Sequence, residues 1–461
     1  MNGSERNAEK RLEIVRRLLQ QRQYAQLRGL LLPLEAADAA QIMEGLPQNE
    51  IPLVFRLLPK ELAAETFVEL PPEQQAQLIE GFSGDELKAV LEELYLDDAA
   101  DLVEEMPANV VQRILAHAAP EQRIGINQIL SYPKDSAGAL MTTELIDLTP
   151  DMTVEDCFRR IRRDAANVET IDVCYVVDAG RRLIGYVTIR TLLLGDYGDR
   201  VEQLMSRSPI SAVTLEDQES VARKFGRYDF LAMPVVDTQG HLVGIITADD
   251  VMDVLREETT EDMEKMAAIL PMDKPYLRAT TFEIWKSRIP WLLLLMISST
   301  FTALIIARFE HALAACMVLT SFIAMLSDTG GNSGSQSSAE VIRALSLGEV
   351  TFRELPRVLW KELRVALLCG VTLAAANFAK MLLVDRMLFH NPAVTFPVIL
   401  VVCLTVIMTV VCAKLLGALF PILAERVGVD PAVIASPFIT TVVDALSLLI
   451  YFGFATTLLH L

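Results

Sequence analysis

Five long apolar runs fill the carboxyl-terminal part of the chain, and they constrain its fold more than any other feature. An α-helix of about 20 apolar residues is long enough to cross the hydrocarbon core of a bilayer. We therefore expect a bundle of five membrane spans between residues 285 and 461. The runs are residues 290–307, 312–327, 365–379, 391–413 and 431–459.

The second run leads into a polar, glycine-rich stretch at residues 328–338, DTGGNSGSQSS. The run itself has 16 residues, which is short for one helical span. Glycine permits unusual backbone angles, and polar, non-helical backbone at membrane depth is tolerated only where protein buries it or where it lines a water-filled cavity. We therefore expect the helix to break here and its oxygen atoms to face the path of a hydrated cation.

Asp444 is the one charged residue in the 29-residue run 431–459. A charge at that depth costs at least about 2.5 kcal/mol, so it usually has a partner or a water-filled path. We interpret Asp444 as a functional residue, with a structural ion pair as the alternative. Asp430 precedes the run and is expected to collect cations at the mouth of the path. Lys414 lies near a run end, where its side chain could snorkel to the interface.

Charge is unevenly divided along the chain. Through Pro275 there are 28 Lys and Arg against 49 Asp and Glu, whereas from Tyr276 onward there are 13 against 11. Because nucleic-acid binding needs clustered Lys and Arg, the acidic part excludes general nucleic-acid affinity and favours cations as ligands. The alternative is that the acidic residues only make this part of the chain soluble. The six cysteines include no C-x-x-C pair, so we expect neither a disulfide framework nor a zinc site.

Basic residues predict the orientation of the spans. The loop between the second and third runs is rich in Lys and Arg, which predicts that it lies in the cytosol. We expect the membrane to be the inner membrane of a bacterial cell. The first 30 residues lack the pattern of a signal peptide, so the amino terminus is expected in the cytosol and the carboxyl terminus outside. The basic residues are Arg343, Arg353, Arg357, Lys361 and Arg364.

Residues 1–132 show a twelve-residue period. Proline follows four of the periodic residues, where it suits the first turn of a helix. Each repeat is therefore predicted to be one short helix in a right-turning solenoid. Asp97, Asp101 and Glu104 share one helix face and repel each other unless a cation sits between them, although a solvated face is the alternative. The periodic residues are Leu46, Leu58, Leu70, Phe82, Leu94 and Met106.

Residues 137–200 and 201–256 resemble each other, each reading as a strand, a helix, two strands and a second helix. The pattern resembles a pair of CBS domains, an α+β module, and residues 244–251 carry the most specific part of the match. The resemblance implies face-to-face pairing and an adenine nucleotide, ATP, as a possible ligand; a purely structural module is the alternative. Thr247 would lie at the phosphates and Asp250 at the ribose, with Arg190 as a third candidate. In the first copy Thr191 stands where Asp is expected.

A strongly acidic segment, residues 257–284, connects the tandem repeat to the first span. We expect a helix that reaches Ile269 and ends before Pro271. Because its acidic residues are concentrated close to the membrane, a cation-bridged partner is favoured over a free solvated face.

The whole layout resembles the MgtE family of magnesium channels. The most specific matches are residues 329–338, residues 430–444 and the acidic motif at residues 97–101. Ala324 departs from the pattern, because relatives often have proline there. The resemblance implies a homodimer in membrane lipids whose pore forms from the second and fifth spans. Magnesium would be held there by Asp444, Asn332 and backbone near Gly331, with Asp430 at the mouth.

The resemblance also implies regulation by magnesium, which would bridge acidic side chains and close the pore when cytosolic magnesium is high. Neither an enzymatic activity nor a protein substrate is expected. The regulatory residues would be Asp97, Asp98, Asp101, Asp249, Asp250, Asp253, Glu257, Glu258, Glu261 and Asp262.

Three other functions compete with a magnesium channel. A transporter of manganese, cobalt or nickel is disfavoured because the pore candidates offer oxygen ligands and neither Cys nor His. An intramembrane metalloprotease needs an H-E-x-x-H motif, but the five histidines are isolated. The third alternative is a nucleotide-sensing membrane scaffold without transport.

Overall fold

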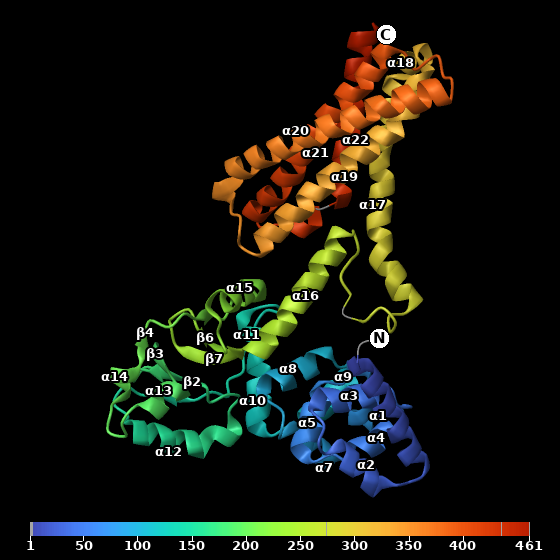
Figure 1. The fold of residues 1–461 in the computed structure, drawn as a ribbon. Coiled ribbons are helices and arrows are strands. Elements are labelled where there is room, and N and C mark those ends of the chain that lie inside the picture. The colour runs from blue at the N-terminus through green and yellow to red at the C-terminus, as the bar shows by residue number, and fades with distance from the viewer. Residues whose placement is uncertain (1–2, 273, 435, 461) are drawn as a thin grey trace. The chain divides into compact units, whose positions relative to one another are not determined.

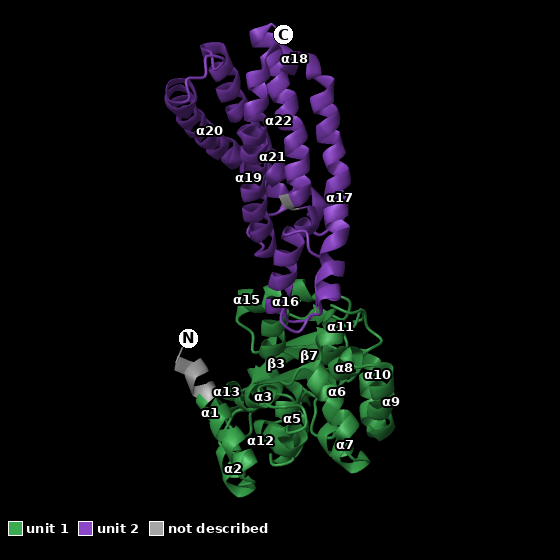
Figure 2. Ribbon diagram, turned by 90° about the vertical axis from the view of Figure 1, so that its right-hand side faces the viewer, with its two compact units in different colours: residues 1–255 green, residues 256–461 purple. Residues whose placement is uncertain are grey.

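The computed structural model describes residues 3–272, 274–434 and 436–460 (Figure 1). The chain forms two compact units, residues 1–255 and residues 256–461, which Figure 2 shows in separate colours. The first contains an array of short helices followed by two small sheets, and the second contains long helices.

Ten helices, α1 to α10, precede the tandem repeat in the described part of the first unit. Proline begins or directly precedes several of them, as the twelve-residue period predicts, and α1, α3, α5, α7 and α9 pack in succession. All six periodic residues are buried, so they form the core of the array. The helices are α1 Gly3–Gln20, α2 Tyr24–Leu31, α3 Ala36–Glu44, α4 Ile51–Phe55, α5 Lys60–Val68, α6 Pro72–Gly81, α7 Gly84–Leu91, α8 Leu96–Glu105, α9 Ala108–His117 and α10 Pro120–Ile129.

The tandem repeat forms two similar sheets with the strand orders β1-β2-β3-β4 and β5-β6-β7. In each, a short parallel strand precedes an antiparallel pair with a register shift at the corresponding valine, Val177 or Val236. Isolated bridges join Arg182 to His241 and Thr142 to Ile245, so the two copies pair directly. The strands are β1 Asp147–Leu148, β2 Val173–Val177, β3 Leu183–Thr188, β4 Ser206–Arg207, β5 Ala212–Val213, β6 Ala232–Val236 and β7 Leu242–Thr247.

Helices complete both copies. The last of them, α16, runs without interruption across the predicted border between residues 256 and 257 and ends at Met266, three residues before the expected end. The first part of the acidic segment, residues 257–266, is thus a continuation of the second repeat's own helix. The helices are α11 Ala137–Leu140, α12 Val154–Asp164, α13 Ile189–Leu194, α14 Val201–Leu204, α15 Gln218–Tyr228 and α16 Ala248–Met266, and a 3₁₀ turn, η1, spans Ala165–Asn167.

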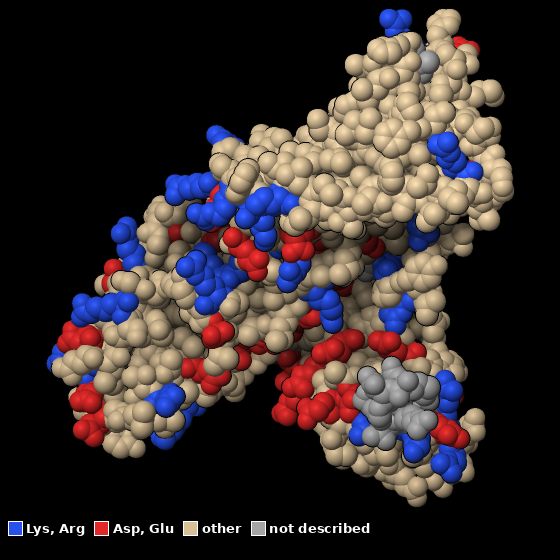
Figure 3. All heavy atoms as spheres, turned by 45° about the horizontal axis from the view of Figure 1, so that its top comes forward, with Lys and Arg blue, Asp and Glu red and all other residues tan. Residues whose placement is uncertain are grey.

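The second unit is a bundle of long helices, and few charged side chains lie on the upper part of the face that Figure 3 shows. Among the described residues, four segments are long and apolar enough to cross a membrane. They are α17, the segment Phe352–Leu388 that contains α20, the helix α21, and the segment Pro431–Leu459 that contains α22. The helix α19 is not one of these four segments; it packs against α21 and α22 and contains the polar stretch. The helices are α17 Thr281–Arg308, α18 Glu310–Ala315, α19 Thr320–Ser346, α20 Leu355–Lys380, α21 Phe396–Val427 and α22 Ser436–Leu459, with 3₁₀ turns η2 Met317–Leu319, η3 Phe352–Glu354 and η5 Pro431–Ile434 and a π-helix, η4 Met381–Leu388.

The expected helix break at residues 328–338 is wrong, because α19 continues through the whole glycine-rich stretch. Its glycines instead allow neighbouring helices to approach closely. A Cβ atom on Gly330 would lie 2.7 Å from Thr409 Cγ2 of α21 and 2.8 Å from Val443 Cγ1 of α22. A Cβ atom on Gly417 of α21 would clash with the Gly334 carbonyl. Glycine serves packing here, while the helical hydrogen bonds satisfy the backbone.

Lys414 also differs from its prediction. The helix α21 extends to Val427, so Lys414 lies well inside it and is buried instead of snorkelling. Its ammonium group donates to Ser337 Oγ at 3.4 Å, and Ser337 donates to Glu362 Oε2 at 2.6 Å. A hydroxyl therefore links the buried lysine to a carboxylate on a third helix.

Candidate cation sites

Asp444 lies on α22 and faces the polar stretch of α19. Its half-buried carboxyl group is close to the Ser327 hydroxyl and to the Asp328 carboxyl group. Asp328 Oδ1 in turn accepts a hydrogen bond from Asn332 Nδ2 at 3.0 Å. We call Asp444, Asp328 and Asn332 the pore face, after the role that the family resemblance implies for this region. Asp328 is thus hydrogen-bonded to Asn332 and lies near Asp444, the two side chains that the sequence analysis assigned to one site.

The pore face carries negative charge without a basic neighbour. In the described part of the chain, Asp444 and Asp328 have no ion pair with Lys, Arg or His within 4.0 Å. Asp328 and Asn332 are exposed in the single chain. Because a charge facing acyl chains is costly, this surface needs either water and cations or a second protein surface.

Gly331, the other predicted pore residue, is buried against Thr440 of α22. Its ideal Cβ position lies 3.1 Å from Thr440 Cγ2, so glycine sets the close approach of the two helices. Within α19 a backbone carbonyl accepts the amide four residues further on. In this conformation, side chains rather than the Gly331 backbone present free oxygen atoms at the pore face.

Asp430 is engaged by a lysine that the sequence did not single out. Lys265 Nζ lies 2.6 Å from Asp430 Oδ2 and also pairs with Glu261. Asp430 Oδ1 accepts the Ala432 amide at 2.7 Å, and Asp262 accepts from Ser346 at 3.2 Å. These contacts, which we call the α16 latch, attach the end of α16 to the last residue of α19 and to the segment that follows α21.

The latch concentrates opposite charges. Burial and the nearby Asp430 raise the pKa of Asp262, although its hydrogen bond from Ser346 opposes the shift. Burial lowers the pKa of Lys265, but its hydrogen bonds to Asp430 and Glu261 outweigh this effect and raise it overall. Lys265 is thus held in its charged form among three carboxyl groups.

A second concentration of acidic groups lies in the first unit, where α8 meets the tandem repeat. Burial raises the pKa of Asp98 to about 6 and that of Asp101 to about 7, and repulsion from neighbouring carboxylates adds to both shifts. The same two causes raise the pKa of Glu169 to about 8 and that of Asp97 well above its ordinary value. The acidic cluster comprises Asp97, Asp98, Asp101, Glu144, Glu169, Asp249 and Asp250.

Two members of the acidic cluster, Glu144 and Glu169, were missed by the sequence reasoning. Both lie in loops of the first repeat, and Glu144 Oε2 accepts the backbone amide of Leu96 at the start of α8 at 3.0 Å. Isolated glutamates in loops give no pattern, so only the packing of α8 identifies them. Of the other predicted regulatory residues, Asp253 and Glu257 lie exposed on α16, and Glu258 is half-buried there.

The cluster does not form a direct metal cage. Among residues 3–272, 274–434 and 436–460, no three His, Cys, Asp or Glu side chains are grouped closely enough to hold a metal ion. Magnesium keeps several of its waters and binds through one or two carboxylates, so this arrangement fits a hydrated ion better than a fully dehydrated one.

The nucleotide candidates occupy equivalent positions in the two repeats. Asp250 accepts hydrogen bonds from the Thr247 hydroxyl and, at 3.3 Å, from the Thr247 amide at the start of α16. In the first copy, Thr188 and Thr191 make the matching hydroxyl contact at 2.9 Å. Arg190 is exposed. Asp250 therefore belongs to both the nucleotide candidates and the acidic cluster.

A bundle of apolar helices with an acidic face between two of them, joined to a tandem pair of similar α+β modules, is typical of a membrane transport protein. Family models match accordingly: a divalent cation transporter domain over residues 323–454, an MgtE intracellular N domain over 34–135, and CBS domains over 137–195 and 201–257.

Similar proteins extend the match over nearly the whole chain. A magnesium transporter MgtE of Thermus thermophilus is 37% identical over 94% of this chain and 95% of that protein. One of Bacillus subtilis is 32% identical over 96% of both. The ATP complex of the cytosolic domain of the Mg²⁺ channel MgtE covers 52% of this chain and 98% of that chain, at 38% identity and a TM-score of 0.50. The chain belongs to the MgtE family, a family of transporters rather than enzymes.

Proposed function

We propose that this protein is a magnesium channel that mediates Mg²⁺ uptake across the bacterial cell membrane. The observation that carries the proposal is the pore face, where Asp444 of α22 meets Asp328 and Asn332 of α19 without a basic partner in the described residues. Its ligands are all oxygen atoms, which suit a hard, hydrated divalent ion.

The pore requires two chains in this proposal. The Asp328 and Asn332 side chains are exposed in one chain, although α19 packs inside a bundle of apolar helices. A homodimer with α19 and α22 facing its axis would place an Asp444 from each subunit around one hydrated magnesium ion. Two carboxylates neutralise one divalent ion, whereas a monovalent ion would leave a net charge in a low-dielectric region.

The orientation follows from the loops. Five α-helical spans, α17 and α19–α22, with the basic loop after α19 in the cytosol, would place the amino terminus in the cytosol and the carboxyl terminus outside. The acidic cluster and the α16 latch would then face the compartment whose magnesium concentration the cell must control.

Cytosolic magnesium is proposed to close the channel. The raised pKa values of Asp98, Asp101 and Glu169 show how poorly the acidic cluster tolerates its own charge. Hydrated magnesium would relieve this repulsion and fix the start of α16, the helix whose far end carries the latch. When magnesium falls, repulsion would loosen α8 from α16 and favour opening.

ATP is proposed as a second regulatory ligand. The similar cytosolic domain was crystallised with ATP, as its description states. On this chain, Thr247, Asp250 and Arg190 are the candidate contacts. Because Asp250 also belongs to the acidic cluster, nucleotide and magnesium would act on the same end of α16.

Growth of a bacterium that lacks magnesium uptake tests the transport proposal. We expect the wild-type chain to restore growth at low magnesium and Asp444→Asn to abolish this rescue, because the amide removes the charge that attracts the ion. Asp385→Asn is the matched control. Asp385 lies on the π-helix η4, outside the pore face, and its carboxylate is 3.0 Å from the ammonium group of Lys380, the last residue of α20. Rescue by Asp444→Asn equal to wild type, or proteoliposome uptake of manganese, cobalt or nickel in place of magnesium, would overturn the proposal.

A further inference from the structure

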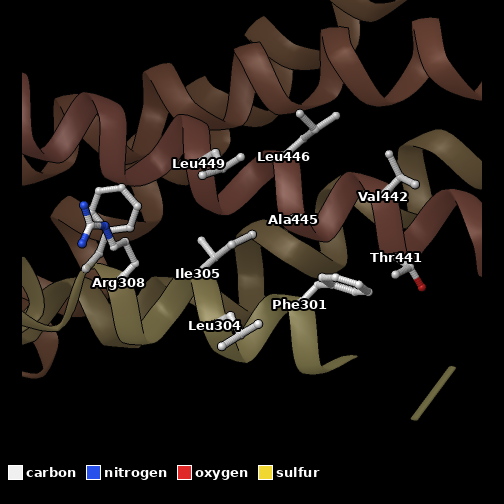
Figure 4. A pocket seen from close by; sticks show the side chains of 10 residues that line it. Phe301, Leu304, Ile305, Arg308, Thr441, Val442, Ala445, Leu446 and Leu449 are labelled. Atoms are coloured by element: carbon white, nitrogen blue, oxygen red, sulfur yellow. The ribbon is translucent and has the colours of Figure 1, made fainter. Parts of the chain in front are cut away.

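A groove runs between α17 and α22 on the outside of the bundle, with a volume of about 560 Å³ (Figure 4). Its α17 wall belongs to an apolar segment that contains a stretch of 18 residues, none of which is buried. Its α22 wall extends from Thr441 to Leu449, on both sides of Asp444 in the sequence. The apolar lining includes Phe301, Leu304, Ile305, Ala445, Leu446 and Leu449.

One end of the groove is defined by Arg308 and Phe309. The Phe309 ring stacks on Phe452 of α22 with their centroids 4.7 Å apart, which holds the end of α17 against α22. Arg308 is exposed and is the one charged residue in the lining, and in the described part of the chain it has no ion pair with a carboxylate within 4.0 Å. The groove thus combines an apolar lining with a positively charged arginine side chain at one end.

The position of Arg308 along its helix indicates which kind of ligand the groove could hold. Arg308 is the last residue of α17, directly after the apolar run, so it lies at the level where a membrane-spanning helix meets lipid headgroups. A guanidinium group binds phosphate oxygens through two parallel hydrogen bonds. An apolar groove that leads away from it toward the middle of the span matches an acyl chain below that phosphate.

We propose that the groove binds an anionic phospholipid, with one acyl chain between α17 and α22 and the headgroup phosphate on Arg308. Zwitterionic lipids also carry a phosphate, but their positive group offsets the attraction to Arg308. The bound chain would pack on α22 on the face that bears Ala445, adjacent in sequence to Asp444. If the proposed pore function holds, the lipid supports the pore helix from behind; lipid binding itself does not depend on that function.

Native mass spectrometry of the full-length protein tests the site. The purified chain is loaded with phosphatidylglycerol or phosphatidylcholine in separate samples, and the retained lipid is counted. We expect the wild type to retain phosphatidylglycerol preferentially. Arg308→Gln should weaken phosphatidylglycerol binding about tenfold, the scale of one lost charged hydrogen-bonding group. Ala445→Leu, which narrows the groove, should reduce retention of both lipids.

Arg386→Gln is the matched control, because Arg386 is an exposed arginine on η4 outside the groove. Equal retention of the two lipids by the wild type, or equal loss in Arg308→Gln and Arg386→Gln, would overturn the proposal. If Ala445→Leu does not fold, the comparison of the two arginine variants still decides. Oxidative cross-linking of Leu304→Cys between two chains would show that a second copy fills the groove and would also overturn it.

Discussion

Ser337 shows how a single residue can hold charged groups inside the bundle. It accepts a hydrogen bond from Lys414 of α21 at 3.4 Å and donates one to Glu362 of α20 at 2.6 Å. Since Lys414 and Ser337 are both buried, neither can readily exchange this contact for water. One hydroxyl therefore links side chains of three helices, α19, α20 and α21.

Ser337→Ala should destabilise the bundle. The substitution leaves the Lys414 ammonium group and the Glu362 carboxylate without their shared partner, which costs about 1–3 kcal/mol for unsatisfied buried groups. The measurement is thermal unfolding of the purified protein in detergent. Ser299→Ala is the control, because Ser299 is exposed and its hydroxyl donates to the Met296 carbonyl of its own helix. Equal midpoints for the two variants would refute this role.

At the scale of elements, α16 connects the acidic cluster at its start to the latch at its end. Lys265→Met removes both ion pairs of the latch and leaves Glu261, Asp262 and Asp430 to repel one another. We expect magnesium uptake into proteoliposomes to persist at magnesium concentrations that close the wild-type channel. Lys274→Met, which disrupts an exposed pair with Glu283, should leave closure unchanged. Normal closure in Lys265→Met would exclude the latch from gating.

The acidic cluster predicts coupling between magnesium and protons. With pKa values of about 7 for Asp101 and about 8 for Glu169, both groups are partly protonated at pH 7. Magnesium favours their ionised forms, so binding should release protons and weaken as the pH falls from 8 to 6. In the absence of magnesium, the raised pKa values make the packed cluster more stable as the pH falls over the same range.

Calorimetric titration of the full-length protein with magnesium, in two buffers of different ionisation enthalpy, measures the released protons. Glu169→Gln should release fewer protons than the wild type, because it removes the group with the highest of the quoted pKa values. Glu202→Gln, on the exposed face of α14, should match the wild type. Proton release that is the same in all three proteins would contradict the assignment.

At the scale of the whole molecule, the exposed pore face predicts a second subunit. An uncovered Asp328 within a membrane-spanning helix would cost at least about 2.5 kcal/mol, so two copies should bury it around a shared aqueous path. Asn332→Cys should therefore form an oxidative cross-link between chains. Leu368→Cys, an exposed apolar position on α20, should not. A protein that is monomeric in the membrane and never cross-links at residue 332 would disprove the dimeric pore.

Much of this architecture is readable from the chain because local patterns generate it. Long apolar runs specify membrane helices, a twelve-residue period with proline specifies short packed helices, and two copies of one strand pattern specify paired sheets. Asp444 stood out for the same reason, since a lone charge in an apolar run is visible without coordinates.

Tertiary structure decided which distant groups meet. Glycines at 330 and 334 suggested a broken helix, but the backbone is helical there, and the missing Cβ atoms make room for α21 and α22. Lys265, Glu144 and Glu169 acquire significance only through partners far away in the sequence. The sequence by itself determined which segments are apolar, helical or acidic, because those properties are local. Only folding determined the pairing of charges, because electrostatic interactions depend on distance in space rather than on separation along the chain.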